Sequence, residues 1–334
     1  MAINILVTMA SGPIRDGFFP EEVVRKLESL GVVRWNSHNE AMTPAELIQQ
    51  IPDTDICMTG WGTVRYDQEI VQQAPRLQVI AHTGGSVAAL VSDAVYDRGI
   101  HVISGNQLYA ESVAEGVIAY MQSSLRNIPY FHHELQQGHW FGPGHYYNEG
   151  LLDQKIGLVG FGAVARFLVK MLAPFRATIK AYDPYVSDAV LQEYGVMRAS
   201  LDEIFSQSKI ISLHAAKTPA TDHMIGQALL AKIQDGALLI NTARASIIDT
   251  EALVAELRKN RFKAVLDVYD VEPLPPDSPL IGLPNTILLP HMGGPTIDRW
   301  KTVTLALIND IQTILEGRQP RLAIDRAYAM AMTR

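Results

Sequence analysis

The chain alternates short apolar runs with amphipathic stretches, and this alternation predicts strands and helices in turn. The early runs are INILVTM (3–9), VVRWNS (32–37) and DICMTG (55–60), separated by PEEVVRKLESLG (20–31) and TPAELIQQI (43–51). Pro20 and Pro44 stand near predicted helix starts, and Gly31 stands just past a predicted helix end. Similar units follow at 67–84 and 91–104. The first hundred residues therefore predict a small parallel α/β sheet.

A second series of apolar runs begins after a predicted long helix at 109–128. Its members are KIGLVGFG (155–162), TIKAYDP (178–184), KIISLHAA (209–216), GALLINTA (236–243), KAVLDVYD (263–270) and NTILLPHMGG (285–294). They are rich in Val, Ile and Leu without strict alternation, which is typical of parallel strands buried on both faces. Residues 298–317 then predict another helix, which could return to the first domain and make that domain discontinuous.

Composition narrows the class of protein. The 334 residues predict about two domains. An apolar content of 48%, a charged content of 19% and a net charge of −7 describe a globular chain without a basic surface for nucleic acid or an anionic membrane. Cys57 is the only cysteine, which excludes an internal disulfide and favours a reducing cytoplasm. We expect no signal peptide, no membrane span and no metal site.

A glycine motif follows the strand at 155–159. The spacing Gly160-x-Gly162-x-x-Ala165 lies between an apolar strand and an apolar helix. There the first Gly allows a tight turn, the second lets the backbone approach a pyrophosphate, and the small third residue lets helix and strand pack closely. The helix N-terminus adds free N–H groups and a positive dipole end. The motif therefore predicts a dinucleotide site.

Asp183 strengthens this interpretation because it ends the next strand, 21 residues after Gly162. A carboxylate at that distance accepts hydrogen bonds from the adenosine 2′-hydroxyl and repels a 2′-phosphate, so NAD is favoured and NADP is disfavoured. Alternatively, Asp183 begins the DPYVSD turn and caps the following helix.

Three polar residues follow predicted strands of the second series: Arg244, Glu272 and His291. Ligands of open α/β sheets bind beyond the carboxyl ends of the strands, so the three should converge. Arg244 would bind and orient a substrate carboxylate, and His291 would donate a proton to a carbonyl oxygen as hydride reaches the carbon. Glu272 would hold the imidazole ring and raise its pKa. Each has a structural alternative: an ion-pair arginine, a solvated loop glutamate and a buried, hydrogen-bonded histidine.

Together, GLVGFGAVA, AYDP, INTARASIID, LDVYDVEPLPPDSPL and LLPHMGG resemble the D-isomer-specific 2-hydroxyacid dehydrogenases. The resemblance covers most of the chain. It implies a Rossmann doubly wound parallel sheet at 105–296 and a smaller flavodoxin-like α/β substrate domain from 1–104 and 297–334. It also implies a hinged cleft, a homodimer built on the coenzyme domains, and catalysis by Arg244, Glu272 and His291.

The resemblance carries further positions over. Positions implied to bind the coenzyme are Gly160, Gly162, Ala163, Val164, Asp183, His214, Thr218, Thr242, Ala243, Asp267 and Gly293. Positions implied to bind the substrate are Trp61, Gly84, Gly85, Ser86, Arg244 and His291. Trp61 could instead belong to the core.

Some positions depart from the family pattern. Ala245 stands where relatives commonly have Gly, so either its φ is negative or the preceding Arg is presented at a different angle. Ala163 replaces a cation in the glycine loop, and the apolar SVAAL (86–90) does not identify the substrate. Two alternative functions stay open: an NAD-sensing regulator without catalysis, and a formate dehydrogenase-like enzyme, which pairs its His with Gln instead of Glu.

Overall fold

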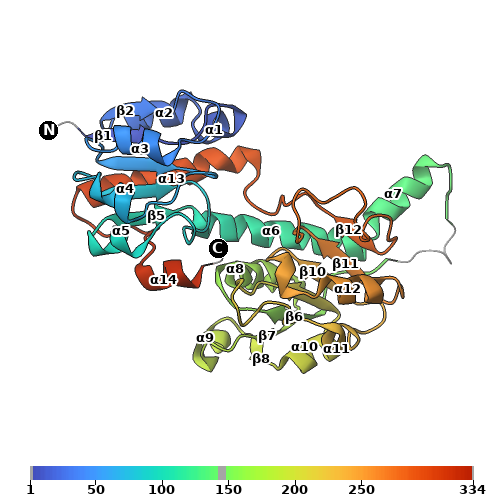
Figure 1. Ribbon diagram of the computed structural model, residues 1–334. Coiled ribbons are helices and arrows are strands. Elements are labelled where there is room, and N and C mark those ends of the chain that lie inside the picture. Colours follow the sequence, from blue (N-terminus) through green and yellow to red (C-terminus); the bar gives the residue numbers. More distant parts are fainter. Residues whose placement is uncertain (1–2, 142–147, 333–334) are drawn as a thin grey trace. The chain divides into compact units, whose positions relative to one another are not determined.

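A computed structural model describes residues 3–141 and 148–332, and it divides into two compact units (Figure 1). Unit 1 comprises Met1–Tyr109 and Pro295–Arg334, and unit 2 comprises Ala110–Gly294. The predicted boundaries at 104/105 and 296/297 lie a few residues from these. The first differs because the helix α6 (Asn106–Leu125) begins in unit 1 and continues into unit 2.

Unit 1 contains a five-stranded parallel sheet in the order β2-β1-β3-β4-β5. The strands are β1 (Asn4–Val7), β2 (Val32–Trp35), β3 (Ile56–Thr59), β4 (Val79–His82) and β5 (His101–Ser104). The helices are α1 (Pro13–Phe18), α2 (Glu21–Glu28), α3 (Pro44–Gln50), α4 (Gln68–Gln72), α5 (Asp93–Asp97), α13 (Ile297–Leu315) and α14 (Arg326–Ala331). This order is the flavodoxin-like one that the resemblance implied.

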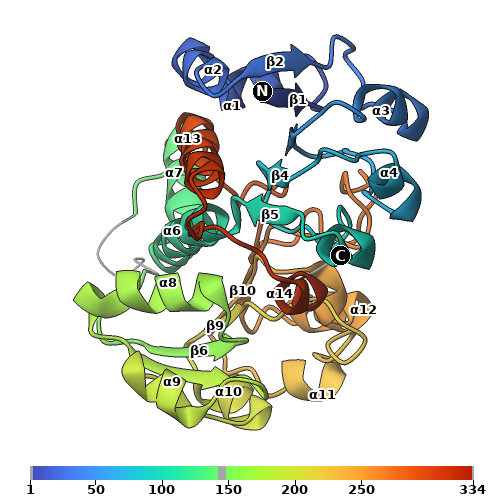
Figure 2. The same ribbon diagram turned by 90° about the vertical axis from the view of Figure 1, so that its left-hand side faces the viewer.

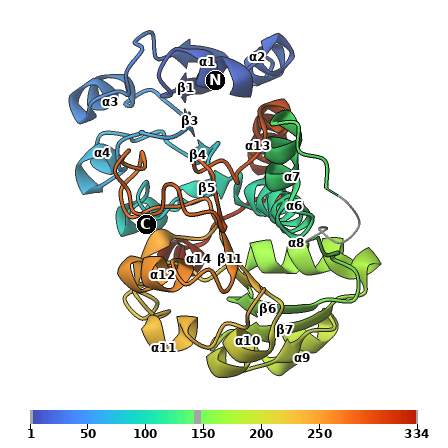
Figure 3. The ribbon, with the colours of Figure 1, turned by 90° about the vertical axis from the view of Figure 1, so that its right-hand side faces the viewer.

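Side chains of β1 alternate between two cores of unit 1. Ile5 and Val7 pack with residues of α1, α2 and α13, whereas Leu6 packs with residues of α3, α4, α5 and α14. Figure 3 shows α3 and α4 on one side of this sheet and α2 and α13 on the other. The C-terminal segment is thus part of unit 1, because α13 buries its apolar face against the N-terminal strands.

Unit 2 contains a seven-stranded parallel sheet in the order β12-β11-β10-β9-β6-β7-β8. The strands are β6 (Lys155–Val159), β7 (Thr178–Tyr182), β8 (Met197–Arg198), β9 (Ile210–Leu213), β10 (Leu238–Asn241), β11 (Lys263–Leu266) and β12 (Thr286–Leu288). The first three strands run outward from β6 and the rest run in the opposite direction from β9, which is the doubly wound Rossmann arrangement. The predicted fold class is confirmed.

Helices cover both faces of the seven-stranded sheet. Besides α6, the helices of unit 2 are α7 (Ile128–Gln136), α8 (Ala163–Leu172), α9 (Asp188–Glu193), α10 (Leu201–Gln207), α11 (Gln227–Leu230) and α12 (Thr250–Leu257), with 3₁₀ turns η2 (Ala173–Phe175) and η3 (Ala245–Ile247). Figure 2 shows α8 and α10 on opposite sides of β6. Residues of α6 and α8 form one core with the sheet, and residues of α10, α11 and α12 form the other.

The predicted helix at 109–128 is two helices in the structure. Asn127 interrupts it with a φ of 52°, a left-handed conformation that Asn tolerates better than most residues. The following α7 then extends away from the sheet of unit 2 (Figure 1). None of the helices in the described ranges has the length and apolarity needed to cross a membrane.

Candidate active site

Most of the residues predicted to bind the coenzyme or act in catalysis follow strands of the unit 2 sheet. Because these strands are all parallel, their carboxyl ends meet at one edge. Gly160 follows β6, Asp183 follows β7, and His214 follows β9. Arg244, Asp267 and His291 lie beyond β10, β11 and β12 in the same way. The topology therefore brings the coenzyme and catalytic candidates to a single edge.

The glycine loop has two glycines with different structural requirements. Gly160 has a φ of 93°, and a Cβ there would lie 2.6 Å from the backbone nitrogen of Ala215. Only glycine fits that position. Gly162 has an ordinary negative φ of −78°, and a Cβ there would meet nothing within 4 Å. The space in front of Gly162 is therefore open, as the approach of a pyrophosphate requires.

Asp183 organises the same loop. Its Oδ2 accepts a hydrogen bond from the Phe161 N–H at 2.7 Å, and its Oδ1 accepts from the N–H groups of Tyr185 at 2.8 Å and Val186 at 3.1 Å. The turn role considered above is thus present, while the N-cap of α9 is Ser187 instead. A hollow of about 470 Å³ is lined by Asp183, Tyr182, Pro184, Arg198, Ala199, Ser200 and Glu203. Asp183 therefore borders a space as well as a turn.

Arg244 is half-buried after β10 and is oriented through the backbone. The Asn241 side chain donates to the Arg244 carbonyl at 3.0 Å and accepts from the Ala243 N–H at 3.0 Å. The Arg244 guanidinium donates to the Ala243 carbonyl at 2.6 Å, and no carboxylate in the described part of the chain forms an ion pair with it. Burial lowers the pKa of Arg244, although the charge of Glu272 opposes this effect. The guanidinium thus keeps donors for an anion.

Ala245 begins the 3₁₀ turn η3 and does not have a positive φ. Of the two possibilities left open by the sequence, the negative φ is the one found. A methyl group is compatible with this backbone conformation without strain.

His291 and Glu272 form a direct pair, with His291 Nδ1 2.6 Å from Glu272 Oε2. Glu272 Oε1 accepts from the Tyr269 N–H at 3.0 Å, so both carboxylate oxygens are held. Burial raises the pKa of Glu272, but hydrogen bonds from His291 and Tyr269 and the charges of His291 and Arg244 lower it by more. An ionised carboxylate only accepts, so the shared proton lies on Nδ1 and leaves Nε2 for other chemistry.

Asp267 holds the backbone that presents His291. Its two oxygens accept from the N–H groups of Met292 at 2.7 Å and Gly293 at 2.8 Å. A Cβ on Gly293 would lie 2.7 Å from Asp267 Oδ2, so glycine is needed there. His291 itself has a φ of 52°. Burial raises the pKa of Asp267, although these two N–H groups act in the opposite direction.

Several polar atoms near these loops lack partners within the protein. His214 Nε2 and Thr242 Oγ1 are buried and make no hydrogen bond in the described chain, and burial lowers the pKa of His214 to about 4. Buried polar groups are normally hydrogen-bonded, so these atoms fit a site that a polar cofactor completes. Thr218 instead bonds to Thr221, and Val164 and Ala243 are partly buried against the two cores.

The substrate candidates of unit 1 lie in a loop after β4 and a turn after β3. Gly84 is buried, and a Cβ there would lie 2.4 Å from Nε2 of the buried His82. The Ser86 hydroxyl accepts from the Ala88 N–H at 3.3 Å. Trp61 is 53% exposed, so it is not a core residue.

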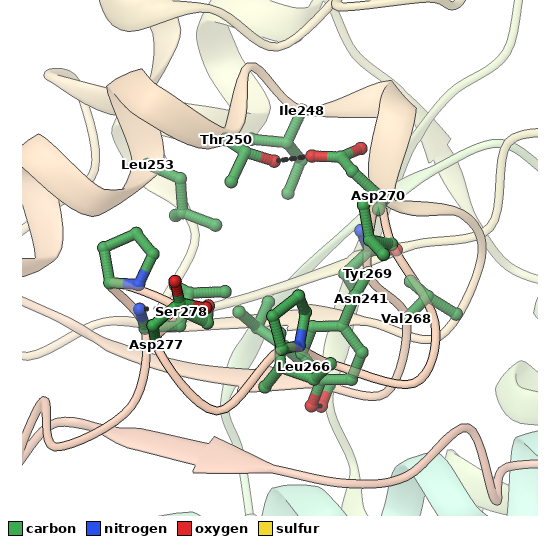
Figure 4. A pocket seen from close by; sticks show the side chains of 16 residues that line it. Asn241, Ile248, Thr250, Leu253, Leu266, Val268, Tyr269, Asp270, Asp277 and Ser278 are labelled. Atoms are coloured by element: carbon green, nitrogen blue, oxygen red, sulfur yellow. Dashed lines mark hydrogen bonds between the residues drawn. The ribbon is translucent and has the colours of Figure 1, made fainter.

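A separate cavity of about 300 Å³ lies beside the loop that carries Glu272. Apolar side chains such as Leu253 and Leu266 line it together with Tyr269 and Asp270. Figure 4 shows the 2.6 Å hydrogen bond from Thr250 to Asp270 at one end of this cavity. His291 and the glycine loop do not line it. No cluster of three metal-ligating side chains occurs among the residues with described positions.

Two residues that organise the site were missed by the sequence analysis. Tyr269 places its hydroxyl 2.9 Å from the carbonyl oxygens of Leu266 and Leu289, which ties together the loops of Glu272 and His291. Asn241 orients Arg244. A polar side chain ending the apolar run LLIN was the available signal for Asn241, whereas nothing in the local sequence indicated the role of Tyr269.

Comparisons with known proteins agree with this architecture. Residues 118–293 match the family described as D-isomer specific 2-hydroxyacid dehydrogenase, NAD binding domain. A D-3-phosphoglycerate dehydrogenase of Methanocaldococcus jannaschii is 30% identical over 299 residues, which cover 89% of this chain and 56% of that protein. A hydroxypyruvate reductase of Thermotoga maritima is 32% identical over 277 residues, which cover 82% of this chain and 89% of that protein.

The chain spans about half the length of the phosphoglycerate dehydrogenases that it matches. Among solved structures, the TT0316 protein from Thermus thermophilus has a TM-score of 0.78 and 27% sequence identity. The similarity covers 97% of this chain and 100% of that one, so it extends over both units.

Proposed function

Because the chain belongs to the D-isomer specific 2-hydroxyacid dehydrogenase family, we propose that it transfers hydride between NAD(H) and C2 of a small 2-hydroxy or 2-keto acid. The observation that carries this proposal is the 2.6 Å contact between His291 and Glu272 at the sheet edge where Arg244 also lies. These three groups supply a proton donor, a group that orients it and an anion anchor.

In the direction of reduction, Arg244 binds the substrate carboxylate and directs the neighbouring carbonyl. A bound nicotinamide supplies the hydride that reaches C2. His291 donates the proton on Nε2 to the carbonyl oxygen, so that an alcohol forms instead of an alkoxide. Glu272 accepts from Nδ1 throughout, which keeps the ring oriented. Oxidation reverses these steps.

The residues that would hold the coenzyme lie along the same edge. The loop from Gly160 to Gly162 and the N-terminus of α8 would accept the pyrophosphate, with Ala163 and Val164 in the first turn. Asp183 would bind the adenosine ribose. The rest of the coenzyme would be surrounded by His214, Thr218, Thr242, Ala243, Asp267 and Gly293. Gly84, Gly85, Ser86 and Trp61 would contact the substrate from unit 1.

The experiment that tests this function is NADH oxidation with glyoxylate, hydroxypyruvate, pyruvate, phenylpyruvate and 4-methyl-2-oxopentanoate. We expect turnover of at least one acid. Tight NADH binding without turnover of any acid would favour an NAD-sensing regulator. NAD⁺ reduction with formate, and with none of the corresponding 2-hydroxy acids, would favour the formate dehydrogenase-like alternative.

We propose NAD over NADP because of the groups that line the hollow around Asp183. The carboxylate repels a 2′-phosphate. Arg198 also lines this hollow, but its guanidinium already bonds to the carbonyls of Asp183 and Val186 and pairs with Asp188. The Arg198 guanidinium is therefore not free to bind a 2′-phosphate. Comparing kcat/KM for NADH and NADPH tests this assignment, and equal values would contradict it.

We also propose a homodimer formed through unit 2. Helix α7 extends from this unit (Figure 1) and exposes Ile128, Tyr130 and Leu135 by 55%, 46% and 52%. Large apolar side chains gathered on one projecting element are typical of a protein interface.

A further inference from the structure

The cavity of about 300 Å³ beside the Glu272 loop is separate from the catalytic edge. All of its lining residues lie between Asn241 and Leu280, within unit 2. None of the residues proposed to bind the coenzyme, to bind the substrate or to act in catalysis lines it. The proposed hydride transfer therefore leaves this cavity without a role.

The inner wall of the cavity is apolar. Its buried side chains, each at most 5% exposed, are Ile248, Leu253, Leu266, Val268 and Leu280. An apolar cavity of about 150 Å³ holds a benzene molecule. A cavity of about 300 Å³ therefore has room for an aromatic ring with a short side chain.

The rim of the cavity differs from the inner wall because it carries two exposed carboxylates, Asp270 and Asp277. Figure 4 shows them on different sides of the open space. Asp270 accepts a hydrogen bond from the Thr250 hydroxyl at 2.6 Å. Within the described part of the chain, neither carboxylate pairs with a cationic side chain, and no lysine, arginine or histidine lines the cavity. The protein itself thus does not neutralise the negative charge of this rim.

The loop that borders the cavity is held in place by its own backbone. Pro275 and Pro279 line the cavity, and proline fixes the backbone φ. The Ser278 N–H donates to the Pro275 carbonyl at 3.0 Å, and the Ile281 N–H donates to the Ser278 carbonyl at 3.0 Å. Leu280 anchors the end of the loop in a core of unit 2. A ligand would therefore enter a preformed cavity, which keeps the entropic cost of binding small.

Two lining residues also hold catalytic candidates. The Asn241 side chain donates to the Arg244 carbonyl, and the Tyr269 N–H donates to the Glu272 carboxylate. Neither Arg244 nor Glu272 lines the cavity itself. The cavity is thus a neighbour of the catalytic edge and not a part of it.

We propose that this cavity binds a small organic ammonium ion whose apolar body is about the size of a phenylethyl group. The apolar body would pack against Leu253 and Leu266. The ammonium N–H groups would donate to Asp270 or Asp277, because charge-assisted hydrogen bonds to carboxylates are among the strongest in proteins. The same rim would repel a carboxylate ligand. Binding at this cavity does not require the proposed function, because it involves no turnover.

The test is isothermal titration calorimetry of the whole chain at neutral pH with three probes of similar shape: 2-phenylethylamine, 2-phenylethanol and 3-phenylpropanoate. We expect the amine to bind with a Kd of about 1 mM or tighter. The alcohol should bind at least about threefold more weakly, since it lacks the charge, and the acid more weakly still. The Kd for NADH, measured with the amine at saturation, should change by less than about twofold.

Asparagine variants test the rim and leave the apolar wall intact. Asp270→Asn keeps an oxygen that can accept from Thr250, and Asp277→Asn changes only an exposed side chain. The double variant should keep the wild-type melting temperature and should bind the amine no better than the alcohol. Glu193→Gln removes an exposed carboxylate on α9 and should leave all three Kd values unchanged.

Several results would overturn this assignment. Equal affinity for the amine and the alcohol in the wild-type chain, or no binding of the amine at about 10 mM, would show that the rim does not select an ammonium ion. Unchanged amine affinity in the double variant, or competition between the amine and NADH, would place the amine at another site. None of these results bears on the proposed function, and absence of turnover with every keto acid would leave the ammonium site standing.

Discussion

His291 illustrates how single residues are organised at this site. Its ring is held by Glu272 at 2.6 Å, and its backbone adopts a φ of 52° in a loop bonded to Asp267. A non-glycine residue in the left-handed region persists when its surroundings impose it. Here the Asp267 carboxylate holds that conformation by accepting from the N–H groups of Met292 and Gly293. Asp267 therefore helps to direct the His291 imidazole through the backbone, without a hydrogen bond to the ring.

Replacing His291 by asparagine should lower kcat by about 10²–10⁴-fold, because a general acid typically contributes that much. The affinity for NADH, measured by fluorescence titration, should change little. His101→Asn, at an exposed position at the start of β5, is the matched control. Residual turnover above a tenth of the wild-type value in His291→Asn would contradict the assigned role.

At the scale of elements, the loop between β6 and α8 contains two glycines that are required for different physical reasons. Gly160 is required by backbone conformation and by its contact with Ala215, whereas Gly162 faces open space. The sequence motif presents both in the same way. Only the packing of the loop against the chain after β9 distinguishes them.

This difference predicts opposite effects for two alanine variants. Gly160→Ala should lower the free energy of unfolding by about 1–3 kcal/mol or more, because of the strained φ and the 2.6 Å approach to Ala215. Gly162→Ala should change it by less than about 0.5 kcal/mol. It should nevertheless raise the Kd for NADH about tenfold, because its methyl group enters the space left for the coenzyme.

Chemical denaturation and NADH titration measure these two quantities separately. Wild-type NADH affinity in Gly162→Ala would show that the open space in front of this loop is not used by the coenzyme.

Helix α12 carries a buried carboxylate that matters for pH dependence. Glu256 is 0% exposed and pairs with Lys259 at 2.6 Å and Arg261 at 3.0 Å. The hydrogen bond from Lys259 lowers the pKa of Glu256 to about 2; burial opposes this, and bonds from Arg261 and Gln227 assist it. The folded pKa is thus below the unfolded value of about 4.3.

Stability from Glu256 is therefore present above about pH 4.3 and is lost as the pH falls towards 2. Glu256→Gln should lower the free energy of unfolding at pH 7 by about 1–3 kcal/mol, because the amide leaves donors facing donors. Urea unfolding from pH 7 to pH 3 should show the gap between wild type and variant narrowing below pH 4. A constant gap would contradict the ionic role.

At the scale of the whole molecule, both units use parallel sheets with a reversal of strand order, at β1 and β3 in unit 1 and at β6 and β9 in unit 2. Unit 1 is discontinuous, because it also contains α13 and α14 from the C-terminal part of the chain. Within unit 2, helix α7 exposes the large apolar side chains of Ile128, Tyr130 and Leu135.

The proposed homodimer predicts a mass of twice 36.8 kDa in light scattering coupled to size exclusion. The double variant Ile128→Asp with Leu135→Asp should elute as a monomer, because the interface would have to bury two carboxylates. The control variant Val32→Asp, on unit 1, should leave the measured mass unchanged. A monomeric wild-type chain at micromolar concentration would contradict the dimer.

The sequence by itself determined the fold class and the residues that meet at the sheet edge. Apolar runs ending in Gly160, Asp183, Arg244 and His291 identify parallel strands, and parallel strands place whatever follows them at one edge. The parallel α/β class and the shared edge need only local periodicity and the chirality of α/β folds, whereas the Rossmann and flavodoxin-like arrangements were implied by the family resemblance.

Tertiary structure alone decided how those residues are held. Asp267 accepts hydrogen bonds from the loop after His291, and Tyr269 links the loops of Glu272 and His291. These contacts join positions far apart in the chain. The space in front of Gly162 likewise depends on how distant segments pack around it. It also decided that Trp61 lies exposed on an aromatic cluster instead of in the core. Contacts of this kind depend on which strands become neighbours, and local sequence preferences do not specify those long-range neighbours.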